Sequence, residues 1–129
     1  MDRASNCVNW FEIPVDDLQR AKYFYQKIFN IEMGEDTIMG MQMAFFPSVQ
    51  GNGKVDGALV KSEIHKPNTE GVLVYLNANP DIRAVLERIE EEGGMIFMQK
   101  TSINAGSGFI AVFMDTEGNR IALHSVPAK

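Results

Sequence analysis

The chain has few of the features that mark secreted, membrane-spanning or nucleic-acid-binding proteins. Cys7 is the only cysteine among 129 residues, so no intramolecular disulfide can form and a reducing compartment is expected. No apolar run approaches the roughly 20 residues that span a bilayer, and residues 1–6 contain no apolar signal core. The net charge of −5 gives no reason to expect a nucleic acid as partner. These absences predict a cytoplasmic protein with neither membrane nor nucleic acid as partner.

Hydrophobic periodicity predicts the same order of elements in each half of the chain. The first half reads as a strand, a helix and three strands, over residues 8–15, 17–30, 33–39, 41–46 and 55–62. The second half repeats this order over residues 71–78, 81–94, 95–100, 109–115 and 120–126. Asp17 and Asp81 begin the two helices, 64 residues apart. The polar, proline-containing segment 65–70 is the expected joint, so His65 is predicted to be a solvated linker residue.

This repeat predicts an α+β fold, with two βαβββ modules that form a cupped mixed sheet and a helix on the outer face of each module. We expect a single domain over residues 1–129, made of one repeat at about 6–64 and a second at about 70–127. The faces of the sheet without helices would form a concave surface, which is where a small-molecule ligand is expected to bind.

Three stretches resemble the vicinal oxygen chelate superfamily, which includes glyoxalase I, the bleomycin resistance proteins and the extradiol dioxygenases. They are WFEIPVDDL at 10–18 with the aromatic pair Phe24-Tyr25, the helix from Asp81 to the Gly-Gly at 93–94, and the hairpin at 113–121. Phe-Glu-Ile-Pro at 11–14 and Glu-Gly-Asn at 117–119 look like the corresponding stretches of small bacterial glyoxalase-like proteins. The family commonly builds or completes its clefts from two chains, so the resemblance also implies a homodimer.

The resemblance implies metal-ligand positions, and this chain fills them with residues that cannot bind a metal. These positions fall at Trp10, Val74 and Ala122, and near Gly57–Ala58. None of these side chains offers a lone pair to a divalent cation. Asp56 is adjacent to the last position but is expected to face the other way. We therefore expect no metal and no other cofactor, and metal-dependent glyoxalase or dioxygenase chemistry is not expected.

Alternation along the strands leaves polar and aromatic groups in the predicted cup. Glu12 shares a face with Trp10, and His124 shares one with Ala122. A carboxylate and an imidazole there could act as an acid–base pair, or be a hydrogen-bonded pair or two residues in water at the rim. Trp10 could stack against a planar or cationic ligand, or simply fill the space left by a metal. The methionine wall that includes Met43 suits an apolar ligand, and core packing is the more frequent explanation for such a wall. The predicted ligand-binding residues are Trp10, Glu12, Met43, Val74, Ala122 and His124, with Glu12 and His124 as the catalytic candidates.

Three hypotheses follow for function. The first is a metal-independent small-molecule-binding protein, which resembles the bleomycin resistance proteins in needing no metal; in those proteins sequestration alone protects the cell. The second is a glyoxalase-type lyase or isomerase in which Glu12 and His124 move protons on a small carbonyl compound, with no cation to stabilise the enediolate oxygen. The third is an accessory domain without chemistry. A deep, ordered pocket would contradict the third hypothesis, and a cup filled by Trp10 and the methionines would favour it.

Overall fold

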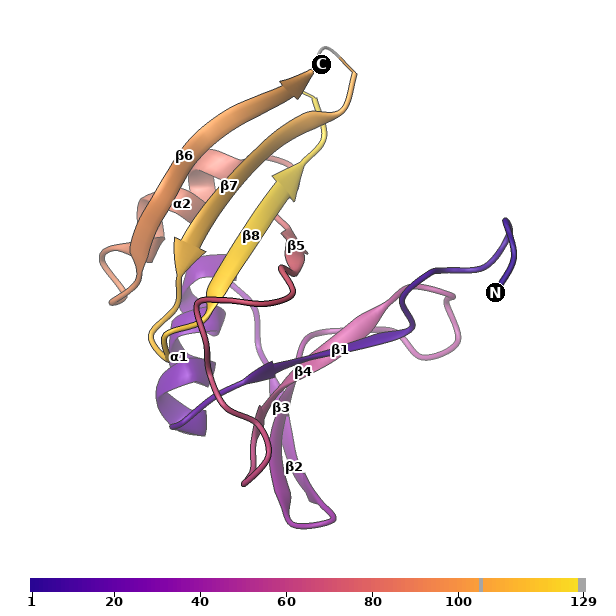
Figure 1. Ribbon diagram of the computed structural model, residues 1–129, viewed down its shortest axis with the longest axis vertical. Helices are drawn as coiled ribbons and strands as arrows, with labels where there is room; N and C mark the ends of the chain where they lie inside the picture. Colours follow the sequence, from indigo (N-terminus) through magenta and orange to yellow (C-terminus); the bar gives the residue numbers. More distant parts are fainter. Residues whose placement is uncertain (105, 128–129) are drawn as a thin grey trace.

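The computed structural model describes residues 1–104 and 106–127, and it confirms the repeated βαβββ order (Figure 1). The first module contains β1 (Trp10–Pro14), α1 (Leu18–Phe29), β2 (Gly34–Ile38), β3 (Met41–Phe45) and β4 (Asp56–Lys61). The second module contains β5 (Tyr75–Asn77), α2 (Ile82–Ile89), β6 (Met95–Asn104), β7 (Gly108–Met114) and β8 (Arg120–Ser125). Strand β5 is shorter than the predicted strand at 71–78, and β6 continues beyond the predicted end at residue 100.

Each module builds its own four-stranded mixed sheet. The N-terminal sheet has the strand order β1-β4-β3-β2, and the C-terminal sheet has the matching order β5-β8-β7-β6. In each sheet the first strand of the module lies parallel to the last one, and the remaining neighbours are antiparallel. The predicted α+β fold class is therefore confirmed, and within the described residues its eight strands form two separate sheets.

Both helices begin at the predicted aspartates. The carboxylate of Asp17 accepts a 3.0 Å hydrogen bond from the backbone N–H of Arg20, and that of Asp81 accepts one of 3.0 Å from Arg83. These N-caps satisfy backbone donors that the first turn of a helix leaves free. Helix α1 ends at Asn30, which adopts the left-handed conformation with φ 54°. No helix in the described part of the chain is long and apolar enough to cross a membrane.

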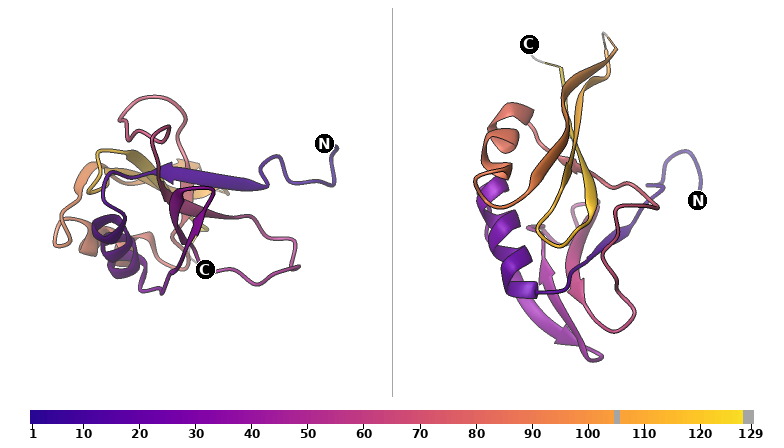
Figure 2. Two further views of the ribbon diagram at one scale, coloured as in Figure 1. Left: turned by 90° about the horizontal axis from the view of Figure 1, so that it is seen from below. Right: turned by 60° about the vertical axis from the view of Figure 1, so that its left-hand side comes forward.

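The two helices contact each other and lie on the same side of the molecule, against both sheets (Figure 2). Apolar residues from both modules meet there in one continuous core. Its largest fully buried side chains are Tyr25, Phe24, Phe113, Ile13 and Ile28. Each sheet thus buries the face that its helix covers, and the opposite face stays open.

The turn between β7 and β8 ties the two modules together. Glu117 accepts hydrogen bonds from the backbone N–H groups of Asp16 and Asp17, at 2.9 and 2.8 Å. Its carboxylate also forms an ion pair with Arg20, at 2.7 Å. The amide of Asn119 donates a 2.6 Å hydrogen bond to the carbonyl of Pro14. Polar groups of the second module therefore fix the point where β1 leads into α1.

Candidate functional site

The open face of the N-terminal sheet, on the side away from the helices, carries a second apolar cluster. It consists of the buried residues Met43, Ala58 and Val60 with Met41 and Phe45 packed against them. Strand register adds Trp10 and Glu12 to this face, because they pair with Asp56 and Ala58 in the parallel β1–β4 ladder. Met43 is 5% exposed and Trp10 is 42% exposed, so the floor of this face is covered and its aromatic rim is accessible.

Glu12 is the centre of a hydrogen-bonded chain of side chains. Its Oε1 lies 2.7 Å from Nε2 of His65, and its Oε2 accepts a 3.1 Å hydrogen bond from the indole N–H of Trp10. The hydroxyl of Ser62 lies 2.6 Å from the other ring nitrogen of His65. Four side chains from β1 and from the segment after β4 therefore hold one another in place. We call Ser62, His65, Glu12 and Trp10 the Glu12 cluster.

The contacts of Glu12 favour its charged form. The hydrogen bond from His65 lowers the pKa of Glu12 below its usual value, and the one from Trp10 adds to this effect, while partial burial acts in the opposite direction. The Trp10 ring is held at its nitrogen by Glu12 and is flanked by Phe45, with 6.2 Å between the ring centroids. The cluster thus presents a carboxylate beside an exposed aromatic ring.

The prediction that His65 is a solvated linker residue is wrong. Its side chain is only 14% exposed, and both ring nitrogens have side-chain partners. Sequence analysis missed this role because the joint was interpreted from its polar composition alone. The signal available was the spacing of Ser62 and His65 just after a strand that pairs with β1, since a serine three residues before a histidine can close a local turn.

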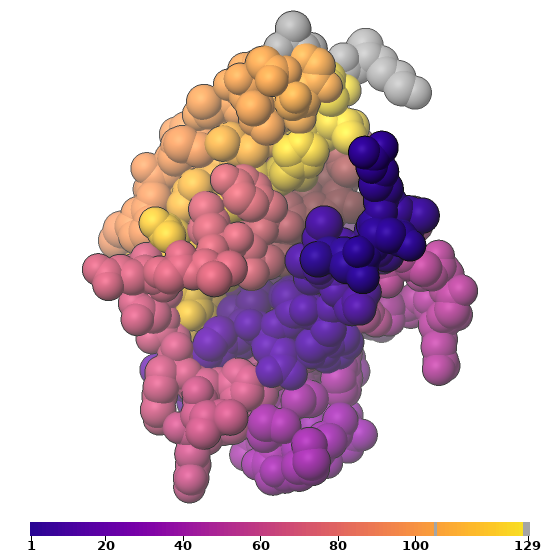
Figure 3. Space-filling view, turned by 45° about the vertical axis from the view of Figure 1, so that its right-hand side comes forward, coloured from indigo at the N-terminus to yellow at the C-terminus, as the bar shows by residue number. Residues whose placement is uncertain are grey.

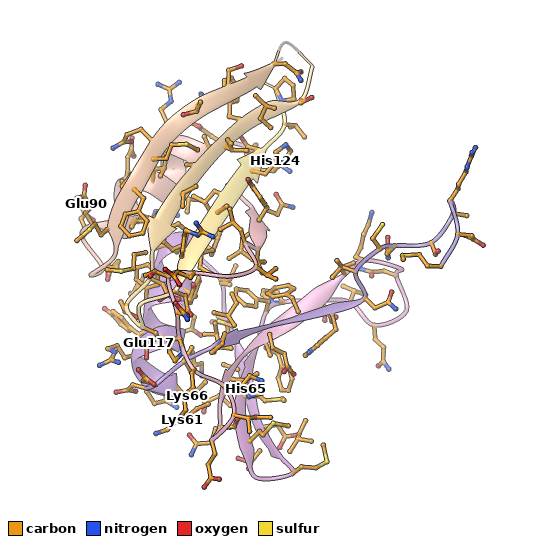
Figure 4. The ribbon with its side chains drawn as sticks, in the orientation of Figure 1. Lys61, His65, Lys66, Glu90, Glu117 and His124 are labelled. Atoms are coloured by element: carbon orange, nitrogen blue, oxygen red, sulfur yellow. The ribbon has the colours of Figure 1, made fainter. Side chains whose placement is uncertain are left out.

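His124 lies on the other sheet, and it does not pair with Glu12 in this chain. Its Nε2 is 2.8 Å from the carbonyl oxygen of Ser107, and its neighbour in the ladder is Asn77 on β5. Figure 4 shows His65 and His124 well apart, at the two sheets. Alternation correctly places Glu12 on the open face of its own strand. It carries no information on how two separate sheets are oriented, and this is why the predicted pair is absent here.

The structure shifts one further predicted position by a residue. The backbone N–H of Val15 donates a 3.0 Å hydrogen bond to the carbonyl of Val60, and the equivalent bond in the second module, from Ala78 to His124, is 2.8 Å long. Asp17 lies two positions after Val15, whereas Asp81 lies three positions after Ala78, so counting back from the helix start is misaligned by one.

Counting back one residue further makes Leu73, and not Val74, the counterpart of Trp10, and Tyr75 is the residue beside Ala122 in the ladder. Val74 packs against the main core, although it also borders the grooves described below. Asp56 needs a similar correction. It is the register partner of Trp10 and shares its face, where the sequence suggested the opposite one.

The donor atoms at the superfamily's metal positions do not suit a divalent cation. Trp10, Ala58, Leu73 and Ala122 provide no ligating atom, and Tyr75 beside Ala122 offers only a phenol. The nearest carboxylate and imidazole, Glu12 and His65, are hydrogen-bonded to each other. Among residues 1–104 and 106–127, no three His, Cys, Asp or Glu side chains lie close enough together to hold an ion.

Two grooves flank the Glu12 cluster. The larger, of about 1070 Å³, separates the two modules, and Trp10 lies in its wall with Tyr75 and Arg88. The smaller, of about 360 Å³, lies under the segment that joins the modules and is bordered by Glu12, Lys66 and other residues. In the space-filling view the surface is recessed between the indigo N-terminal segment and the yellow strand β8 (Figure 3). Trp10 and Glu12 thus stand between two accessible hollows.

Solved structures of several proteins share this fold. A glyoxalase family protein from Bacillus cereus has a TM-score of 0.71 and 16% identity, covering 99% of both chains. The fosfomycin resistance protein FosX from Listeria monocytogenes has a TM-score of 0.62 and 20% identity, covering 97% of this chain and 94% of FosX. TnmS3, an antibiotic-binding protein from Streptomyces sp. CB03234, has a TM-score of 0.60 and 22% identity, covering 98% of this chain and all of TnmS3.

These identities are low, so the likenesses establish the fold and leave the ligand open. None of the curated proteins matches the chain. The model of one family, described as the Glyoxalase/Bleomycin resistance protein/Dioxygenase superfamily, matches residues 8–123, which include both modules. With the repeated βαβββ units described above, this match shows that the chain belongs to the Glyoxalase/Bleomycin resistance protein/Dioxygenase superfamily.

Proposed function

We propose that the protein binds a small molecule, without a metal ion, at the open face of the N-terminal sheet around Trp10, Glu12 and Met43. The observation that carries this proposal is the Glu12 cluster. It holds a carboxylate and a partly exposed indole ring next to one another over a buried apolar floor. A few fixed polar groups beside apolar and aromatic surface are typical of small-molecule sites.

The likeness to an antibiotic-binding protein supports binding over turnover. TnmS3 is named as an antibiotic-binding protein and has this fold over nearly the full chain, whereas FosX is named only as a fosfomycin resistance protein. The lowered pKa of Glu12 points the same way. A general base works best when its pKa lies near the working pH, and a stabilised carboxylate is a weaker base. The lyase or isomerase hypothesis, which needs Glu12 to move protons, is therefore the less favoured one.

Binding can be tested with the only tryptophan of the chain as the reporter. The full-length protein, treated with a chelator, would be titrated with a panel of drug-sized molecules while Trp10 fluorescence is recorded. We expect at least one saturable change that persists in the chelator and disappears in the Met43→Asp variant, which places a charge on the apolar floor. Saturable binding only after metal is restored, or no binding by any compound, would overturn the proposal.

We further propose that a second copy of the chain completes the site. The unpaired edges of β1 and β5 both border the larger groove, and exposed aromatic side chains stand beside them, with Trp10 42% and Tyr75 51% exposed. Unpaired strand edges and exposed aromatic residues are features of protein–protein interfaces. In such a dimer the open face of the C-terminal sheet, with Ala122 and His124, would form the opposite wall of the cleft.

Light scattering on the purified protein tests this assembly. A homodimer has twice the 14.4 kDa mass of the chain. We expect Tyr75→Asp to convert the dimer into monomers, because it places a charge in the interface. The matched control is Tyr23→Asp on α1, where the tyrosine is 55% exposed and borders neither groove. A monomeric wild-type protein, or equal effects of the two variants, would contradict the dimer.

A further inference from the structure

The hydrogen bonds of Ser62 determine which nitrogen of His65 carries a proton. The Ser62 oxygen accepts hydrogen bonds from the backbone N–H groups of Ile64 and His65, at 3.1 and 3.2 Å. Both lone pairs of the hydroxyl are then occupied, and its own O–H remains free to donate. Its side-chain partner among residues 1–104 and 106–127 is Nδ1 of His65, at 2.6 Å. The neutral ring therefore carries its proton on Nε2 and donates it to Glu12.

Glu12 consequently receives a hydrogen bond at each oxygen, from His65 and from Trp10. A carboxylate has about four acceptor positions, so roughly two remain for a ligand. Donors at both oxygens stabilise the ionised form of Glu12, and an ionised carboxylate can only accept hydrogen bonds. A ligand that meets these free positions must bring N–H or O–H donors, and a cationic ligand gains the most there.

Among the described residues, Glu12 has no lysine or arginine as its ion-pair partner. Every register position on the open face of the N-terminal sheet is apolar, aromatic or acidic, without a lysine or arginine. Lys66, which borders the same groove as Glu12, is not paired with it. Asp56, the neighbour of Trp10 across the ladder, adds a second carboxylate. The face of an indole ring also attracts cations.

We propose that the Glu12 cluster selects a planar organic cation, such as an amidinium or a protonated heteroaromatic amine, with the ring of the ligand against Trp10 and its N–H donors on Glu12. In this arrangement His65 and Ser62 are positioning residues, which hold the carboxylate but do not touch the ligand. The inference rests on the proposed function, since it names the ligand class of that same site.

Three probes of one shape and different charge test this selection. Benzamidinium is a planar cation, benzamide is its neutral counterpart and benzoate is the anion. Titrations of the full-length protein would follow Trp10 fluorescence. We expect benzamidinium to bind at least about tenfold more tightly than benzamide, as a charge-assisted hydrogen bond provides, and benzoate not to bind. Glu12→Gln should reduce the affinity for benzamidinium to that for benzamide. Glu35→Gln should change neither affinity, because Glu35 lies on the same sheet but pairs with Lys22 on α1.

The outcomes separate this inference from the proposed function. Equal affinities for benzamidinium and benzamide, or a preference that survives Glu12→Gln, would overturn the cation selection and leave small-molecule binding intact. If none of the three probes binds but other compounds change Trp10 fluorescence in the chelator-treated protein, the selection again fails alone. If no compound of either set binds, both proposals fail.

The positioning role of Ser62 and His65 has a separate spectroscopic test. The chain has only two histidines, so nitrogen NMR resolves His65 from His124. In the neutral ring we expect a protonated Nε2 and an unprotonated Nδ1 at His65. Ser62→Ala removes the donor to Nδ1, so it should mix the two tautomers and weaken benzamidinium binding several-fold without affecting benzamide. A wild-type ring protonated at Nδ1, or an unchanged tautomer and affinity in Ser62→Ala, would refute this role.

Discussion

The buried hydroxyl of Tyr25 on α1 donates a 2.7 Å hydrogen bond to the carboxylate of Asp115, in the turn between β7 and β8. Tyr25 belongs to the first module and Asp115 to the second, so this contact joins the two repeats at the centre of the molecule. Burial raises the pKa of the Tyr25 hydroxyl well above its usual value, and it also raises the pKa of Asp115. The tyrosine therefore keeps its proton, and remains a donor, above the pH at which an exposed tyrosine would lose it.

Removing this hydroxyl should destabilise the protein without altering its shape. Tyr25→Phe leaves an oxygen of Asp115 with one donor fewer, and we expect a loss of about 1–2 kcal/mol in the free energy of unfolding. Urea denaturation followed by circular dichroism measures this loss. Tyr23→Phe is the matched control, because Tyr23 is exposed on the same helix and should show almost no change. Equal stability of the two variants would mean that the contact between the modules contributes nothing.

The ion pair of Glu117 predicts a dependence of stability on pH. Burial acts to raise the pKa of Glu117, but hydrogen bonds from Arg20, Thr116 and the backbone of Asp16 and Asp17 outweigh it, and the pKa is lowered. A lowered pKa in the folded state contributes stability above the unfolded value, here about 4.5, and this contribution is lost as the pH falls through the folded value.

Glu117→Gln should therefore be less stable than the wild-type protein by about 2 kcal/mol at pH 7. The gap should close as the pH falls below 4.5, where the wild-type carboxylate itself becomes protonated. Comparing the two proteins at each pH cancels the opposite effect of Asp115, whose raised pKa makes its contribution fall as the pH rises. Thermal and urea unfolding between pH 3 and pH 7, at values chosen about half a unit apart, measure the gap. A constant gap across this range would contradict the assignment.

Gly57 on β4 predicts a local effect on the strand that carries Trp10 and Glu12. A Cβ added at Gly57 would collide with the backbone carbonyl oxygen and the ring of Phe11 on β1. We expect Gly57→Ala to destabilise the protein by about 1–3 kcal/mol, as overpacking does, and to shift the Trp10 emission spectrum. Gly34→Ala on β2 is the control, because no atom lies within 4 Å of its added Cβ. A Gly57 variant as stable as the Gly34 variant would show that β1 is free to move.

The residues at the superfamily's metal positions predict that the protein retains no divalent metal. Untagged protein would be incubated with Ni, Zn, Mn and Fe(II), desalted and analysed by elemental mass spectrometry. We expect less than about one ion per ten chains, because Trp10, Ala58 and Ala122 have no ligating atoms. One ion per chain of any of these metals would contradict the expectation and would direct attention to Glu12, His65 and Tyr75 as ligands.

Local sequence patterns determined the fold of this protein and the face of the sheet on which the side chains of a strand lie. Alternation placed Trp10 and Glu12 on one face of β1, and the aspartates at 17 and 81 marked the helix starts, because both signals depend on residues close together in the chain. The same repeat predicted two matching modules. The hairpin at 115–119 was recognised only as a turn, although its side chains also join those modules.

Only the tertiary structure decided which side chains meet at the candidate site. His65 reaches Glu12 because β4 lies parallel to β1 and the chain folds back after it, and the partners are 53 residues apart. Val74 gave way to Leu73 as the counterpart of Trp10 because one more residue separates β5 from its helix, and a one-residue shift turns a side chain to the other face. His124 belongs to a separate sheet, and the orientation of two sheets depends on core packing between the modules, which no periodicity within a strand encodes.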